Sequence, residues 1–112
     1  MTQEERFDAQ VEATLQEIRD LLIVKGKEYR RNNDVYHNFS QGARITGETP
    51  EKVLHGFLLK HLVSMADIRN DISSGIEINP DKVKEKWTDA LVYLVIEKCM
   101  ILDRIENNID HE

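Results

Sequence analysis

The first clear pattern along the chain is a series of apolar residues at intervals of three and four between residues 4 and 29. The series consists of Phe7, Val11, Leu15, Ile18 and Leu22, and the positions between them are mostly polar. This spacing places the apolar side chains along one side of an α-helix. The sequence therefore predicts an amphipathic helix from Glu4 to about Tyr29, which frays near residues 27–31 because Gly26 weakens its last turn.

The segment after this helix lacks any periodicity. Residues 30–37 are rich in Arg, Asn and Asp and predict a loop. Asn38 is a residue type that caps helices, so we expect a short helix from there to Gly47. A glycine at that position suits the left-handed conformation in which many helices end.

Two further long helices are predicted from one start signal, a capping side chain followed by proline. Thr49 and Pro50 begin a helix that ends near residues 71–72, before a Ser-Ser-Gly segment. Asn79 and Pro80 begin another that runs past residue 105, and we expect the acidic tail to fray from about residue 106.

Together these signals predict an all-α fold: three long helices and one short helix in a single domain over residues 1–112. The last two long helices carry more apolar residues than one face holds. The stripe of the helix after residue 49 is Leu54, Leu58, Met65, Ile68 and Ile72, with Leu59, Leu62 and Val63 outside it. The stripe of the last helix is Val83, Trp87, Ala90, Leu91, Leu94, Ile101 and Ile105, with Val92, Val95, Ile96 and Met100 outside it. Because helices that are apolar all round must be buried all round, we expect a helical bundle that assembles as a homo-oligomer.

The composition is 40% hydrophobic and 32% charged, which is typical of a globular chain. Its longest uncharged apolar stretch, residues 90–96, is far shorter than the roughly 20 residues that cross a bilayer. The polar first ten residues do not predict a secretory signal, and the single cysteine, Cys99, favours the reducing cytoplasm. A net charge of -6 argues against duplex nucleic acid or a membrane as the main partner.

One segment of this acidic chain is basic. Residues 25–44 hold five Lys and Arg residues against two acids. Such a segment is either a solvated loop or a local anion site, and the second interpretation predicts a phosphate-bearing small molecule as ligand.

Two polar strips interrupt the apolar helices. One contains Lys60, Ser64, Asp67 and Asp71, within about 60° on a helical projection, and the other contains Glu85, Asp89 and Tyr93 at spacings of four. If the strips face one another, Asp67, Asp71, Glu85 and Asp89 supply four carboxylates, which suit Mg²⁺ or Mn²⁺. Two alternatives stay open: surface pairing of the acids with Lys82 and Lys86, or a buried ion pair of Lys60 with Asp67 or Asp89 that orients a ligand without a metal.

His61 falls on the apolar stripe of its helix rather than on the polar strip. It is either a core histidine with a hydrogen-bond partner or a ligand-binding residue. Cys99, flanked by Met100 and Ile101, is expected to be a core residue rather than a nucleophile.

Several segments together resemble one family. They are KGKEY at 25–29, YHNF at 36–39, TPEKVL at 49–54, LLKHLVSMAD at 58–67 and EKWTDALVYLVI at 85–96. In this order they resemble small bacteriophage proteins of the nucleotide-modification-associated type one family, which are distantly similar to the all-helical MazG-type nucleotide pyrophosphohydrolases. The resemblance spans about residues 25–100 and implies a location in the host cytoplasm. The residues that match the family pattern are Lys27, Tyr29, Asn38, Phe39, Lys60, His61, Asp67, Asp89 and Tyr93.

The chain departs from the MazG-type enzymes in its acidic residues. Those enzymes resemble one another through an E-x-x-E pair on one helix and an E-x-x-D pair on the next, which hold magnesium. Here the paired acids are spaced by four, and Lys60 and His61 stand where an enzyme has acids, which suits direct contact with a phosphate.

Two hypotheses follow from these observations. In the first, the chain is a phage-type binding protein without a cofactor that sequesters a nucleotide or cyclic-nucleotide signal of host defence in an oligomer. Lys27, Arg30 or Lys60 would then contact phosphate, Tyr29 or Phe39 would stack on the base, and Asn38 would read its edge. In the second, it is a Mg²⁺-dependent pyrophosphohydrolase with Asp67, Asp71, Glu85 and Asp89 on the metal and His61 or Lys60 assisting at the phosphoryl group.

Overall fold

The computed structural model describes residues 1–110, and the side chains of residues 1–107. It contains α1 (Gln3–Tyr29), α2 (His37–Thr46), α3 (Pro50–Ser73) and α4 (Pro80–Asp110). Over this range the chain forms no β-strand, and an isolated bridge joins Arg31 and Asp34 in the loop between α1 and α2. The all-α fold with three long helices and one short helix is confirmed. None of the described helices has both the length and the apolar character needed to cross a membrane.

The predicted start signals of α3 and α4 are confirmed at the level of hydrogen bonds. The Thr49 hydroxyl accepts the backbone N–H of Lys52 at 3.3 Å, and Pro50 occupies the first turn of α3. The Asn79 side chain accepts the N–H of Asp81 at 2.9 Å. Each contact satisfies a backbone donor that has no partner within its own helix, which is why both helices begin there.

The prediction that Asn38 caps α2 is wrong, because α2 has already begun at His37. The Asp34 side chain accepts the N–H of Tyr36 at 2.9 Å, and the Tyr36 carbonyl then accepts the N–H of Phe39 at 3.0 Å. The residue that precedes α2 is thus Tyr36, two residues before the predicted cap. Gly47 ends α2 in the left-handed conformation, as predicted, with φ of 74°.

Helix α4 runs past residue 105, as predicted, and continues through Asp110. Fraying of the tail from residue 106 stays a prediction. Residues 111–112 of the predicted tail lie outside the described part of the chain.

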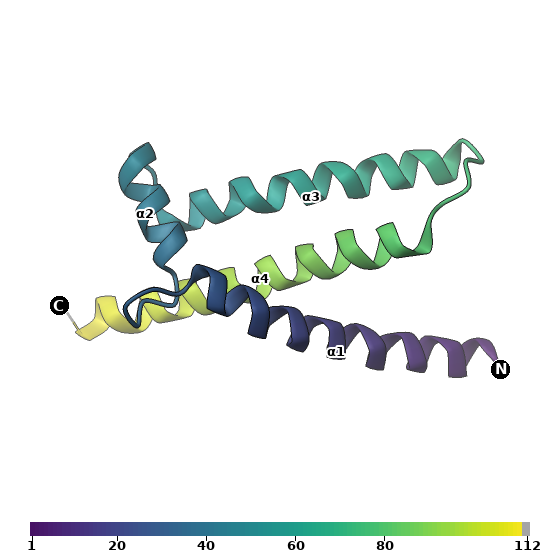
Figure 1. Ribbon diagram of the computed structural model, residues 1–112, viewed down its shortest axis with the longest axis horizontal. Coiled ribbons are helices and arrows are strands. Elements are labelled where there is room, and N and C mark those ends of the chain that lie inside the picture. Colours follow the sequence, from purple (N-terminus) through teal and green to yellow (C-terminus); the bar gives the residue numbers. More distant parts are fainter. Residues whose placement is uncertain (111–112) are drawn as a thin grey trace.

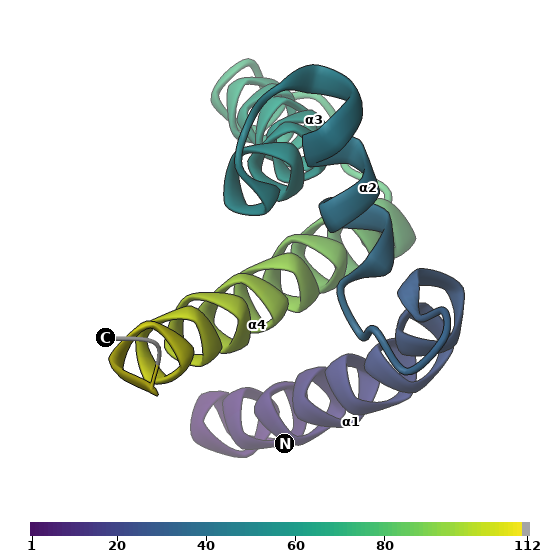
Figure 2. The ribbon, with the colours of Figure 1, turned by 90° about the vertical axis from the view of Figure 1, so that its left-hand side faces the viewer.

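Helix α4 is the central element of the molecule (Figures 1 and 2). Helices α1 and α3 both pack against α4, and within the described residues they do not contact one another. α1 runs in the same direction as α4 and α3 runs opposite to it, while α2 lies across the beginning of α3 (Figure 1). The molecule is therefore elongated, with extents of 54 × 28 × 24 Å.

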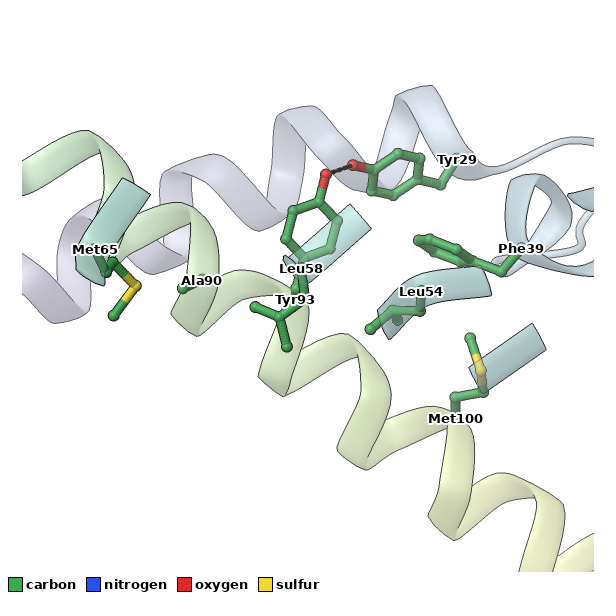
Figure 3. Packing of buried hydrophobic residues seen from close by; sticks show 8 residues of the cluster. All are labelled: Tyr29, Phe39, Leu54, Leu58, Met65, Ala90, Tyr93 and Met100. Atoms are coloured by element: carbon green, nitrogen blue, oxygen red, sulfur yellow. Dashed lines mark hydrogen bonds between the residues drawn. The ribbon is translucent and has the colours of Figure 1, made fainter. Parts of the chain in front are cut away.

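The core lies where the end of α1 meets α2, the first half of α3 and the middle of α4 (Figure 3). Phe39 of α2 and Leu54 of α3 are fully buried there. Burial of such side chains stabilises a fold by about 1.5–3 kcal/mol each. The first half of α1 contributes little to this core, since Phe7, on its apolar stripe, is 62% exposed.

Candidate functional site

The aromatic residues proposed for base stacking are part of the core. Phe39 has no exposed surface, and its ring centroid lies 5.0 Å from that of Tyr29, which is also buried. Because Phe39 presents no free face, its expected stacking role does not fit this arrangement, whereas Tyr29 still lines a hollow between α1 and α4. Asn38, the residue expected to read the base edge, is exposed on the outside of α2.

Tyr29 and Tyr93 form the polar centre of this core. Their hydroxyl oxygens are 3.0 Å apart and share a hydrogen bond between α1 and α4 (Figure 3). Burial raises the pKa of both Tyr29 and Tyr93, so both hydroxyls are protonated near neutral pH. The pair therefore joins two helices rather than supplying a base or a nucleophile.

His61 faces inward, as its place on the apolar stripe predicts. Its ring centroid lies 5.5 Å from that of Tyr93, and its Nδ1 lies 3.8 Å from Asp89 Oδ2. That separation exceeds a hydrogen bond, and the buried Nδ1 has no partner among the described residues. His61 is thus a partly buried histidine whose Nδ1 lacks a partner among the described residues, and an unpaired buried polar group costs about 1–3 kcal/mol.

The four carboxylates predicted to bind metal are divided between two hollows. Asp67 and Asp71 line a hollow of about 460 Å³ at the α3–α4 turn, opposite Lys82 and Lys86. Glu85 and Asp89 line another of about 380 Å³ between α1 and α4. No three His, Cys, Asp or Glu side chains of the described residues converge closely enough to hold a metal ion. The predicted magnesium site therefore does not form within one chain.

Two acidic residues that the sequence reasoning passed over lie in the hollow between α1 and α4. They are Glu17 and Asp20 of α1, and the Thr88 hydroxyl donates to Glu17 Oε2 at 3.1 Å. Their spacing of three was a visible signal. However, neither residue belongs to the apolar stripe of α1, which is the side of this helix expected to pack.

The lysines of the predicted site are exposed. Lys60 forms no ion pair with Asp67 or Asp89, so the predicted buried pair is absent. Lys27 is likewise exposed in the last turn of α1. Neither Lys27 nor Lys60 lines any of the hollows described here.

Arg30 is also exposed, but unlike Lys27 and Lys60 it lines a hollow. This hollow has a volume of about 270 Å³ and lies between the end of α1, the following loop and α4; we call it the Arg30 hollow. It is lined by Leu22, Gly26, Tyr29, Arg30, Val35, Tyr36, Val95, Ile96 and Cys99. The Arg30 guanidinium folds back over α1, with Nη2 3.6 Å from the position that a Cβ on Gly26 would take.

The Arg30 hollow is positively charged as well as apolar. No carboxylate lines it, and no acidic side chain of the described residues forms an ion pair with Arg30. Tyr36 lies on its wall, and burial raises the pKa of the Tyr36 hydroxyl, which is therefore neutral. A guanidinium on aliphatic and aromatic walls suits an anion that carries an apolar body.

Comparison with known proteins identifies no relative of this chain. The chain matches no protein-family model, no curated protein and no solved structure. The resemblance to the phage family and to MazG-type enzymes therefore stays a prediction from sequence.

Proposed function

We propose that this chain binds a small anionic molecule of the nucleotide type in the Arg30 hollow. The observation that carries the proposal is the Arg30 guanidinium, unpaired by any described carboxylate, at the edge of a hollow with apolar walls. Arginine presents a planar set of donors that matches a phosphate with two parallel hydrogen bonds.

The remaining walls of the hollow suit the base or sugar of such a ligand. Val35 and Val95 supply aliphatic surface, and Tyr36 supplies an aromatic ring. A volume of about 270 Å³ is at the small end of ligand pockets, which favours one nucleotide unit over a longer chain. The net charge of -6 also disfavours an extended polyanion.

Binding without turnover is the better supported activity. Among the residues that the structure describes, no carboxylate or histidine lines the Arg30 hollow to serve as a general base. In a homo-oligomer, such sites would withdraw nucleotide signals from solution. This role agrees with the resemblance to phage proteins in a host cytoplasm.

The test is a panel of mono-, di- and cyclic nucleotides, measured by thermal shift and calorimetry. A ligand at a hundredfold excess over its Kd raises stability by about 2.7 kcal/mol. We expect Arg30→Gln to weaken binding at least tenfold. Arg44→Gln, which removes an exposed arginine of α2, is the matched control and should bind as the parent does. The bound molecule should return intact after denaturation. If no nucleotide stabilises the protein, or if both variants weaken binding equally, the proposal is wrong.

A second activity is tested separately because acids from two helices line one hollow, although no three of the described acids converge on a metal position. Glu17 and Asp20 of α1 lie there with Glu85 and Asp89 of α4. A Mg²⁺-dependent pyrophosphohydrolase would release pyrophosphate from nucleoside triphosphates. It would lose this activity on Asp89→Asn and keep it on Asp71→Asn, since Asp71 lines the other hollow. This result would show that the protein hydrolyses nucleotides rather than only binding them.

A further inference from the structure

Helix α4 carries an apolar stripe that packs against the core at Trp87 and is exposed at Leu94 and beyond. It consists of Trp87, Leu91, Leu94, Lys98, Ile101 and Ile105, at alternating spacings of four and three. Leu94, Ile101 and Ile105 are 46%, 41% and 51% exposed. This alternation is the heptad spacing by which two helices pack along one another. The buried residues of α4, such as Val92 and Met100, belong to other faces of the helix.

Helix α3 extends this surface at one edge. The Arg69 guanidinium lies over the Trp87 ring, 5.4 Å from its centroid, and so places that side of α3 next to the stripe. Leu62 precedes Arg69 by seven residues and therefore shares its side of the helix. Its side chain is also exposed. The stripe is thus the centre of a broader apolar face.

The exposed area of the chain is what a stable self-association would require. Its accessible surface is 8405 Å², whereas a compact monomer of 13.1 kDa exposes about 6,400 Å². The surplus of about 2,000 Å², to which the exposed apolar side chains of α1 also contribute, is comparable with the ~1,000 to 2,500 Å² that each chain of an obligate dimer buries. The radius of gyration, 17.0 Å against about 13 Å for a compact chain of this length, indicates the same deficit of packing.

We infer that a second copy of this chain packs on the α4 stripe, with the stripes of the two copies facing one another. A stripe that is apolar except at one position is complementary to itself, as a two-fold interface requires. Lys98 is that position, and a single polar residue in such a stripe restricts the register in which two helices pair. The stripe would be the interface of the homo-oligomer named in the proposed function. Its pairing does not require a bound ligand.

The experiment is a mass measurement in solution, by light scattering after gel filtration and by sedimentation equilibrium. We expect the parent protein to have at least twice the monomer mass of 13.1 kDa. Leu94→Glu and Ile105→Glu should each reduce it to that of one chain, because each would place an unpaired carboxylate from both copies in an apolar interface. Both positions are exposed, so circular dichroism should show unchanged helix content.

The matched control is Ile45→Glu, since Ile45 is the more exposed residue, at 85%, but lies on α2. It should keep the mass of the parent protein. Arg30→Gln should also keep it, so failure of ligand binding and failure of this inference are distinguishable. A monomeric parent protein, or unchanged mass in both stripe variants, would overturn the inference. So would a parent protein that gains mass only with lipid vesicles or with another protein.

Discussion

At the scale of single residues, the Tyr29–Tyr93 hydrogen bond predicts that substitutions of the two tyrosines have non-additive effects on the free energy of unfolding. Tyr93→Phe leaves the buried Tyr29 hydroxyl unpaired, which we expect to cost about 1–3 kcal/mol of unfolding free energy. Tyr29→Phe should cost a similar amount. The double variant should cost clearly less than the sum, because it leaves no orphaned hydroxyl. Urea denaturation of the four proteins measures this, and simple additivity would show that the hydroxyls do not interact.

The same burial predicts how the tyrosines titrate. The pKa of each of the three tyrosines, Tyr29, Tyr36 and Tyr93, is raised above 10.0, with burial as the largest cause. A raised folded pKa means that the fold favours the neutral phenol. The associated stability is complete below pH 10 and is lost as the pH rises through the folded values. Tyrosinate absorbance should therefore appear at higher pH in the native protein than in urea. Coincident titration curves would contradict the burial of these hydroxyls.

At the scale of the elements, alanine substitutions at two glycines distinguish the effect of packing between helices from the effect of helix propensity. A Cβ on Gly42 of α2 would lie 2.8 Å from Val53 Cγ1 of α3, whereas a Cβ on Gly56 would meet nothing within 4 Å. Valine has few alternative rotamers in a helix, so the crowding is not easily relieved. We expect Gly42→Ala to destabilise the fold by about 1–3 kcal/mol. Gly56→Ala should stabilise it by about 0.5–1 kcal/mol.

The two variants are matched because both add one methyl group inside a helix. Adding Val53→Ala to Gly42→Ala should recover part of the loss, since it removes the atom that the new Cβ meets. Thermal unfolding, monitored by circular dichroism, measures the stabilities of these variants. Equal stabilities of Gly42→Ala and Gly56→Ala would show that α2 and α3 are not closely packed at this point.

The helices were predictable because their signals are local. Thr49 and Asn79 cap the helices that follow them through contacts within three residues, which the sequence displays directly. The start of α2 was missed although its deciding contact, from the Tyr36 N–H to the Asp34 side chain, spans only two residues. The residue that precedes this helix is Tyr36, which is not a capping residue type, so the sequence carries no standard start signal there.

The site was less predictable because it depends on which helices are neighbours. Spacing correctly placed Glu85 and Asp89 on one side of α4, but it could not show that α1 rather than α3 supplies the other acids of their hollow. The inward position of His61 followed from periodicity, whereas its missing partner did not. Arg30 was predicted as a phosphate contact. The apolar walls around it come from three separate segments that only the fold brings together.

At the scale of the whole molecule, packing is concentrated at one end. The core joins the end of α1, α2 and the adjoining parts of α3 and α4, while the first half of α1 keeps large apolar side chains in solvent. A chain with this distribution derives little stability from the exposed halves of its helices. If a second copy covers the α4 stripe, association and folding must be linked, because the apolar surface is buried only in the assembly.

This linkage predicts that the melting temperature depends on protein concentration. For a dimer that unfolds to two chains, each tenfold increase in concentration favours the folded state by about 1.4 kcal/mol of dimer, or about 3 °C in Tm. The parent protein and Ile45→Glu should show this slope, while Leu94→Glu should melt at one temperature at all concentrations. Leu94→Glu should also melt lower, because its stripe stays in water. If the parent protein has a flat profile, its exposed stripe has no partner copy in solution, and the elongated chain must be stable on its small core alone.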